Sequence, residues 1–262
     1  MHRRLHLSSL AVLLLSLSGP TGVRAQTGQA LTDSAGDRLT LTLWGGWTSF
    51  SQKSLNDVIR LDNFVLTAPA DSGGAGLEKG IDPLTDAVGG GIEVAWALGP
   101  GRRLIAGIGR LQDGSRVDFL YDDDGDPGTP PVASFLDYRV GAWPIHAGLA
   151  WGFRLDDRLE YTLSASLLYF PSSDLRVRGA IGGPAALDEM GTASGLGAAF
   201  TWGGMVRMGG ALRAGVRVGL RLGRLGDVKT SDGSPIVSAF GDELGLDWSG
   251  VDVQLGLTWA LR

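Results

Sequence analysis

Three residues of this chain have the types and spacing that nucleophilic catalysis requires. His146 lies on the inward face of one predicted strand, and Ser164 and Ser166 lie on the same face of the next strand. A serine hydrolase needs a base within hydrogen-bond reach of the nucleophile and a third group that orients the base. The sequence identifies no acid near His146. We therefore expect a histidine that packs in the interior, and no catalytic site.

Charged residues recur at the alternate, inward-facing positions of the predicted strands. They are Glu93, Arg154, Glu160, Arg207, Arg213, Arg217, Arg221 and Asp252. Arg154 and Glu160 flank a tight turn, which makes them candidate cross-strand neighbours. Side chains fill the interior of a narrow barrel, so we expect these residues to form a charge network that plugs a lumen. The excess of arginine leaves a cation-lined passage for small anions as the alternative.

An acidic stretch at residues 122–128 is spaced like the start of a calcium-binding loop. Asp122, Asp124 and Asp126 alternate, but Pro127 stands where such a loop needs glycine, and no bidentate glutamate closes it. We expect a solvated hairpin tip, with weak binding of a divalent cation as the alternative. The sequence otherwise predicts no metal and no cofactor.

The stretch from Leu212 to Leu222 indicates how the inward charges are positioned. Every second residue is apolar, and Arg213, Arg217 and Arg221 stand between them with two glycines. Successive side chains of a strand point to opposite faces, so one face is aliphatic and the other is cationic. These 11 residues also match the length that a tilted strand needs to cross a bilayer. We interpret the stretch as a transmembrane strand with lipid outside and a polar lumen inside.

Seven other stretches alternate in a similar way. They are residues 39–49, 88–98, 103–121, 142–154, 159–169, 195–208 and 251–262. The stretch from Arg103 is the least regular, because its apolar residues fit neither face alone, and the chain after it returns through residues 134–138. Pro144 cannot donate a ladder hydrogen bond and predicts a bulge.

The connections between these strands alternate between long and tight. Long connections are predicted at residues 50–86, with a short helix near 54–61, at the acidic tip, at 170–193 and at 225–245. Tight turns fall at residues 99–101, 156–157 and 209–210. This asymmetry is typical of barrels whose long loops face outside and whose tight turns face the periplasm. The predicted fold is all-β, an eight-stranded antiparallel up-and-down transmembrane β-barrel.

The start of the chain has the composition of a secretory signal peptide. A short cationic head, an apolar run and small residues before Gln26 predict a signal peptide over residues 1–25. A lead segment then spans residues 26–38, and the barrel domain spans 39–262. Loss of three arginines with the signal peptide lowers the formal charge from −5 to about −8, which argues against a nucleic-acid partner. The chain contains no cysteine, so disulfides are not used.

From Leu39 to Arg262 the chain resembles the small eight-stranded outer-membrane β-barrel proteins of the OmpA transmembrane-domain, OmpX and OmpW type. The resemblance rests on architecture and implies a Gram-negative outer membrane, with membrane lipid and the barrel-assembly machinery as partners. Such barrels usually end on an aromatic residue that serves the assembly machinery. Here the last four residues are Trp-Ala-Leu-Arg, so the alternation is kept but the terminal signal is altered.

We therefore expect a non-enzymatic outer-membrane barrel with a plugged polar lumen, whose long loops contact an extracellular ligand or surface. A narrow pore for small anionic solutes is the alternative, and a lipid-modifying membrane enzyme is a third hypothesis. A secreted, lipocalin-like soluble barrel fits poorly. Its outer faces would not carry uninterrupted aliphatic and aromatic stripes.

Overall fold

The structure is a computed structural model that describes residues 38–68, 76–121, 130–182, 186–237 and 241–261. The predicted signal peptide, almost all of the lead segment and the acidic tip at 122–128 lie outside the described residues. The elements are β1 (Leu39–Ser49), α2 (Lys53–Thr67), β2 (Asp86–Gly99), β3 (Arg102–Tyr121), β4 (Val132–Ala142), β5 (Ile145–Arg154), β6 (Leu159–Ala180), β7 (Ala186–Gly209), β8 (Leu212–Asp227), β9 (Gly245–Asp247) and β10 (Gly250–Leu261).

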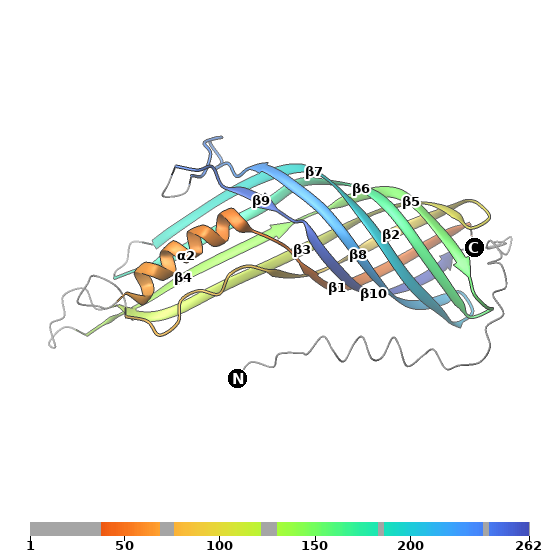
Figure 1. Cartoon of the computed structure of the whole chain (residues 1–262), viewed down its shortest axis with the longest axis horizontal. Helices are drawn as coiled ribbons and strands as arrows, with labels where there is room; N and C mark the ends of the chain where they lie inside the picture. Colours follow the sequence, from red (N-terminus) through yellow and green to blue (C-terminus); the bar gives the residue numbers. More distant parts are fainter. Residues whose placement is uncertain (1–37, 69–75, 122–129, 183–185, 238–240, 262) are drawn as a thin grey trace.

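The strands form one closed antiparallel barrel (Figure 1). Closure depends on β10, which pairs with β1 on one side and with β8 on the other. Between β3 and β6, the short strands β4 and β5 follow one another and together occupy a single position in the ring. The predicted all-β fold with eight antiparallel strands around the ring is therefore confirmed.

The chain breaks between β4 and β5 at Trp143 and Pro144. Proline has no N–H group to donate to a neighbouring strand, so the regular ladder cannot continue through it. The Gly109 N–H instead donates to the Pro144 carbonyl at 2.9 Å, and the Trp143 N–H donates to the Ser172 carbonyl at 3.2 Å. A register shift in β6 lies opposite this break. The predicted irregularity at Pro144 thus divides the wall into two parts. We call the part that contains β5, near the tight turns, the lower part, and the part that contains β4, near α2, the upper part.

The prediction of a long loop at residues 170–193 is wrong, because most of that stretch is strand. β6 continues to Ala180 and β7 begins at Ala186, so these strands contain 22 and 24 residues, against 11 in β1. In the upper part of β6, Leu175 points inward while Asp174 and Arg176 point outward. The alternation therefore persists, but with a polar outer face. The apolar outer stripe therefore marks only the lower part of these strands.

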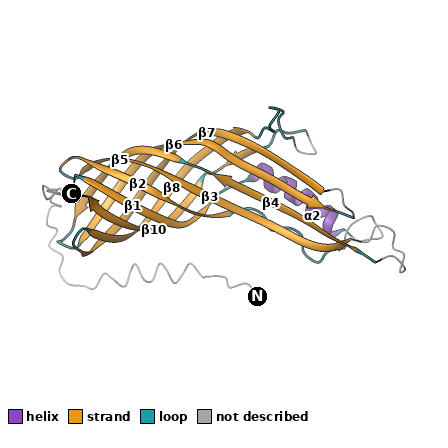
Figure 2. Cartoon of the chain, turned by 180° about the vertical axis from the view of Figure 1, so that it is seen from behind, coloured by secondary structure: helices purple, strands orange, loops and turns teal. Residues whose placement is uncertain are grey.

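Above the closed ring, β3, β4, β6 and β7 continue as an upper wall, and helix α2 packs in its hollow (Figure 2). The predicted short helix is present and extends to Thr67. Its buried face consists of Leu55, Ile59 and Leu66, at helical spacing. Of the residues that the structure describes, none form a helix long and apolar enough to cross a membrane.

A polar contact fixes α2 to the wall. The Tyr138 hydroxyl on β4 donates a hydrogen bond to the Asp62 carboxylate on α2. Burial raises the pKa of Asp62, and the hydrogen bond from Tyr138 opposes that rise. Burial and the neighbouring carboxylate raise the pKa of Tyr138, so its proton stays available for the contact.

Tyr138→Phe is expected to loosen α2 more at neutral pH than at acid pH. Without its donor, the Asp62 pKa in the folded state rises further, so the folded chain loses stability as the pH rises through that pKa and the carboxylate ionises. The loss above that pKa is about 1 kcal/mol, because Asp62 is only partly buried. Limited proteolysis of α2 across a pH series measures it. Asp62→Asn in the same background should remove the pH dependence, and an equal loss at every pH would contradict this reading.

The interior has two layers of different chemistry. The lower barrel encloses charged and hydroxyl side chains, whereas the upper part holds an apolar core that includes the buried face of α2. The largest side chains of that core with no exposed surface are Trp248 and Phe170. Large hydrophobic residues are therefore concentrated above the polar lumen.

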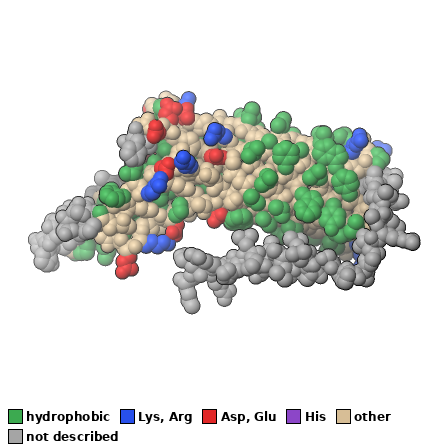
Figure 3. Space-filling model, viewed as in Figure 1, with side chains coloured by type: hydrophobic (Ala, Val, Ile, Leu, Met, Phe, Trp, Pro, Cys, Tyr) green, Lys and Arg blue, Asp and Glu red, His purple; other side chains and the backbone are tan. Residues whose placement is uncertain are grey.

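The outer face of the lower barrel is an apolar belt. Exposed aliphatic and aromatic side chains gather there, whereas charged side chains gather over the upper wall (Figure 3). Trp96 is 60% exposed at the end of the belt near the tight turns, and Trp47 and Trp143 are 38% and 46% exposed at the other end. The belt includes Leu43, Trp47, Val88, Ile92, Val94, Trp96, Leu104, Ile108, Leu149, Leu163, Leu167, Phe200, Trp202, Val218, Leu220 and Leu257.

Candidate functional site

The lowest group of lumen charges lies near the tight turns. The Glu160 carboxylate on β6 forms ion pairs with Arg103 on β3 at 3.3 Å and with Arg213 on β8 at 3.2 Å. Arg154 is opposite Glu160 in the strand register, as predicted. Arg154 and Arg207 nevertheless lie at the rim, and Arg207 is exposed. Sequence reasoning missed Arg103, because the mixed pattern of its strand did not show which face it occupies.

The middle group joins Glu93, Arg217 and His146. The Arg217 Nη1 donates to both oxygens of Glu93, at 3.0 and 2.9 Å, and His146 Nε2 lies 3.1 Å from Glu93 Oε2. The expectation that no acid lies near His146 is therefore wrong. Glu93 and His146 are on β2 and β5, and both are register partners of Gly107 on β3 between them. A Cβ on Gly107 would stand 2.6 Å from the His146 ring, so the contact depends on that glycine.

The upper group centres on Arg221. Its guanidinium forms an ion pair with Asp252 at 3.3 Å and donates hydrogen bonds to the Trp248 carbonyl and the Thr48 hydroxyl. The three arginines of β8 thus contact three different acids at successive heights: Arg213 with Glu160, Arg217 with Glu93, and Arg221 with Asp252. We call this set of pairs the arginine ladder.

Trp248 lies immediately above the arginine ladder, where its carbonyl accepts a hydrogen bond from Arg221. Its ring packs against Phe50 with 4.9 Å between centroids, and its indole N–H donates to the Ser173 hydroxyl at 2.8 Å. Ser173 in turn donates to the Gly141 carbonyl at 2.9 Å. Trp248, Phe50 and Phe170 belong to the same buried core, and we call these three residues the aromatic cap.

The space left inside the lumen is small. A cavity of about 50 Å³ lies beside His146, Ser164 and Thr201, and the hydroxyls of Ser164 and Thr201 are hydrogen-bonded to each other. A water molecule occupies roughly 30 Å³ in the liquid, so this cavity has room for water but not for an acyl chain or a peptide. Within the described residues, no group of three or more histidine, aspartate or glutamate side chains is arranged to hold a metal ion.

No known family model matches the chain, and no curated protein matches its sequence. Two solved structures are similar in part. The attachment invasion locus protein Ail of Yersinia pestis, solved with the heparin analogue sucrose octasulfate, has 9% identity and a TM-score of 0.36, over 84% of this chain and 96% of that one. The outer membrane protease OmpT of Escherichia coli has 9% identity and a TM-score of 0.37, over 87% and 98%. At these values, function must be argued from the chain's own residues.

Proposed function

We propose that the protein is a non-enzymatic outer-membrane barrel that is closed to solutes and that presents its upper wall and α2 outside the cell to a ligand or surface. The arginine ladder beneath the aromatic cap is the observation that carries this proposal. Together these groups fill the lumen where a solute would have to pass.

The outer belt supports a location in the membrane. In water, so many exposed aliphatic and aromatic side chains on one continuous surface would cause aggregation, whereas lipid stabilises them. Aromatic residues stand at both edges of the belt, at Trp96 and at Trp47, as is usual where membrane meets water. Beyond the upper edge the outer face becomes charged, beginning at Arg110 on β3 and Arg224 on β8. An exposed charge at those positions favours water over hydrocarbon.

The upper wall and α2 support a role in contacts outside the membrane. Phe64 and Val65 of α2 are 75% and 56% exposed, in a helix whose opposite face is buried. Exposed apolar residues on a fixed element are typical of interaction surfaces. No chemistry is required of such a surface, and the small cavity beside His146 offers no room for a lipid substrate.

A narrow anion pore is the second candidate. Four lumen arginines (Arg103, Arg213, Arg217 and Arg221) face three acids (Glu93, Glu160 and Asp252), which leaves an excess of positive charge. That excess would favour anions if the cap and the ladder opened together.

Conductance separates the two candidates. The chain, purified in mild detergent from membrane fractions, is expected to show heat-modifiable gel mobility and no steady current in a planar bilayer, because ions would have to cross the cap and the paired charges. A general porin in the same bilayers serves as the positive control. A steady anion-selective current would replace the closed barrel with the pore, and a chain that never reaches the membrane fraction would refute the membrane location itself.

A further inference from the structure

A groove of about 620 Å³ lies between α2 and the segment that leads into β9. Residues of α2 from Lys53 to Phe64 line one side, and Asp242, Glu243 and Leu244 line the other. A helix rises about 1.5 Å per residue, so this stretch of α2 is about 18 Å long. The groove beside α2 is therefore long enough to hold about three turns of another helix.

α2 is apolar on two sides. One side is the buried face described above. The other side lines the groove and consists of Val58, Leu61 and Phe64, which repeat every three residues. Val58 and Leu61 are half-buried, whereas Phe64 and its neighbour Val65 are exposed. A helix needs only one apolar side to fold against a core, so the second side is available to a partner.

The opposite wall of the groove is acidic. Asp242 and Glu243 are exposed there, and the Glu243 carboxyl group contacts that of Asp227 at the end of β8. The hydrogen bond with Asp227 and its negative charge raise the pKa of Glu243, and the positive charge of Lys229 opposes this rise. Two ionised carboxylates in contact repel each other, and a cation placed beside them relieves the repulsion.

The two segments that form the groove carry most of the excess negative charge above the belt. Of the residues that the structure describes, stretches 50–86, 110–141, 170–194 and 224–249 contain 16 acidic and 10 basic side chains, a net charge of −6. The groove segments 50–86 and 224–249 account for −5 of that total. Acidic side chains gather over the connection between β8 and β9 (Figure 3). This side of the molecule therefore attracts a cationic partner.

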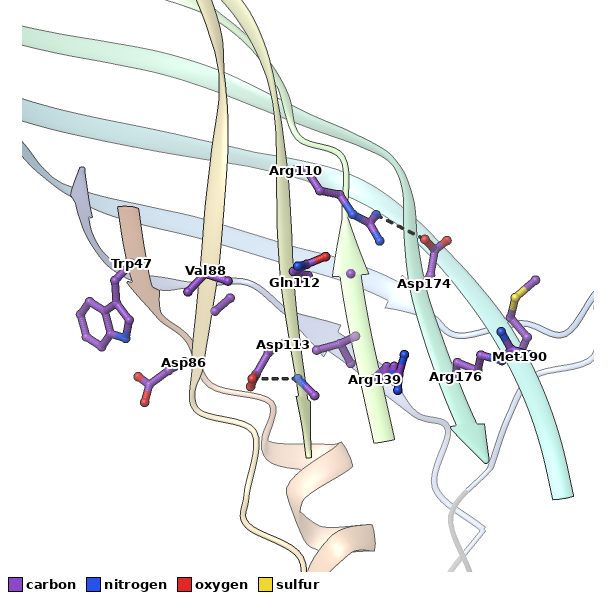
Figure 4. A pocket seen from close by; sticks show the side chains of 14 residues that line it. Trp47, Asp86, Val88, Arg110, Gln112, Asp113, Arg139, Asp174, Arg176 and Met190 are labelled. Carbon is purple, nitrogen blue, oxygen red and sulfur yellow. Dashed lines mark hydrogen bonds and ion pairs between the residues drawn. The ribbon is translucent and has the colours of Figure 1, made fainter. Parts of the chain in front are cut away.

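A hollow on the outer face of the wall does not share this charge imbalance. Arg110 forms an ion pair with Asp174 at 3.5 Å, and Arg139 forms one with Asp137 at 3.0 Å. Asp113 accepts a hydrogen bond from the N–H of the next residue at 2.8 Å (Figure 4). These charges are paired within the chain, so the hollow offers a ligand little electrostatic attraction.

We propose that the groove beside α2 binds a cationic amphipathic helix of a partner. The apolar side of that helix packs on Val58, Leu61 and Phe64, and its lysine or arginine side chains pair with Asp227 and Glu243. An amphipathic helix in an apolar groove is a common mode of peptide recognition. This inference rests on the proposed function and names the class of partner that the surface outside the cell takes.

Both properties of the partner are needed. A small polar cation would leave Phe64 and Val65 in water, and an uncharged apolar peptide would leave the repulsion between Asp227 and Glu243 in place. A helix that is apolar on one side and cationic on the other satisfies both walls of the groove.

Fluorescence anisotropy with the full chain in phosphatidylcholine nanodiscs tests the proposal. The probe is a labelled synthetic helix of leucine and lysine, about 14 residues long, with its leucines on one side. We expect saturable binding above the background that empty nanodiscs give. Replacing the leucines by serine, or the lysines by glutamate, should reduce binding to that background. Failure of the leucine–lysine helix to bind, or equal binding of either altered peptide, overturns the proposal.

A first pair of variants tests the apolar wall. Phe64→Ser with Val65→Ser should weaken binding at least about tenfold, since the leucines of the probe lose these contacts. Leu120→Ser with Val132→Ser removes exposed apolar side chains from β3 and β4 and is the matched control, which should leave the affinity unchanged. An unchanged affinity in the Phe64 variant contradicts the assigned site.

A second pair tests the acidic wall. Asp227→Asn with Glu243→Gln should weaken binding at least about tenfold and flatten its dependence on salt concentration. Asp118→Asn with Asp188→Asn removes the same charge from exposed positions on β3 and β7 and should change the affinity by less than about twofold. Equal weakening by both pairs would mean a general attraction by the acidic surface and would overturn the groove as the site.

Two further measurements separate the remaining outcomes. Displacement of the probe by Mg²⁺, but not by NaCl of equal ionic strength, would identify a metal-cation site and overturn the proposal. Each sample is first tested for heat-modifiable mobility. A chain with folded, membrane-derived mobility and no current that does not bind the probe refutes this inference alone. Absence from the membrane fraction, or a steady current, refutes the proposed function as well.

Discussion

Glu93→Ala is expected to lower the free energy of unfolding by about 3–5 kcal/mol, since removing one partner of a buried ion pair leaves the other charge uncompensated. The Glu93 and Arg217 side chains are only 10% and 11% exposed, and Glu93 also contacts His146. After the substitution, a guanidinium and an imidazole inside the lumen lose the carboxylate that both contact.

Urea unfolding of the barrel in lipid vesicles measures the loss. Glu78→Ala, at an exposed carboxylate, is the control and should change stability by no more than about 0.5 kcal/mol. Combining Glu93→Ala with Arg217→Ala should cost clearly less than the sum of the two single changes, because neither charge is then left alone. Additive losses in this double-mutant cycle would show that the pair is not coupled and that the lumen tolerates an isolated charge.

Trp248→Ala is expected to cost about 3–5 kcal/mol, the usual range for removing a large aromatic side chain from a core. Trp248 has 0% exposure, packs on Phe50, and donates to Ser173. Its replacement leaves a cavity between the apolar core and the arginine ladder and removes the donor that faces the Ser173 hydroxyl.

The midpoint of the heat-modifiable mobility shift, or urea unfolding, measures this change. Trp248→Phe keeps an aromatic ring but loses the indole N–H, so it should cost about 1–2 kcal/mol. The current across a planar bilayer should remain absent in Trp248→Ala, because the ladder beneath it is intact. A current in this variant would mean that the aromatic cap alone closes the lumen.

The cap and the ladder are joined at one point. Arg221 donates to the carbonyl of Trp248 and pairs with Asp252, so the top pair of the ladder also holds the backbone of the cap. We therefore expect that opening the lumen would require both the apolar and the polar layer to rearrange. This joint requirement is why we favour a closed barrel over a pore that opens by the movement of one side chain.

The alternation of side chains along each strand could be predicted from the sequence. A strand has a period of two residues, so each stretch such as Leu212–Leu222 specifies its own inner and outer face without reference to the rest of the chain. The tight turns at residues 99–101, 156–157 and 209–210 could likewise be predicted from their own glycine and aspartate residues. These local signals determined the barrel, its apolar belt and the inward position of the β8 arginines. They failed where the outer face becomes polar, so the upper parts of β6 and β7 were predicted as a loop.

Only the tertiary structure decided which inward charges meet. Glu93 and His146 are 53 positions apart and come together because the registers of β2, β3 and β5 place both beside Gly107. The same holds for Trp248, whose position above the ladder depends on contacts with Phe50, Ser173 and Gly223 from separate strands and connections. Register and ring closure arise from pairing between distant segments, and no local pattern carries that information.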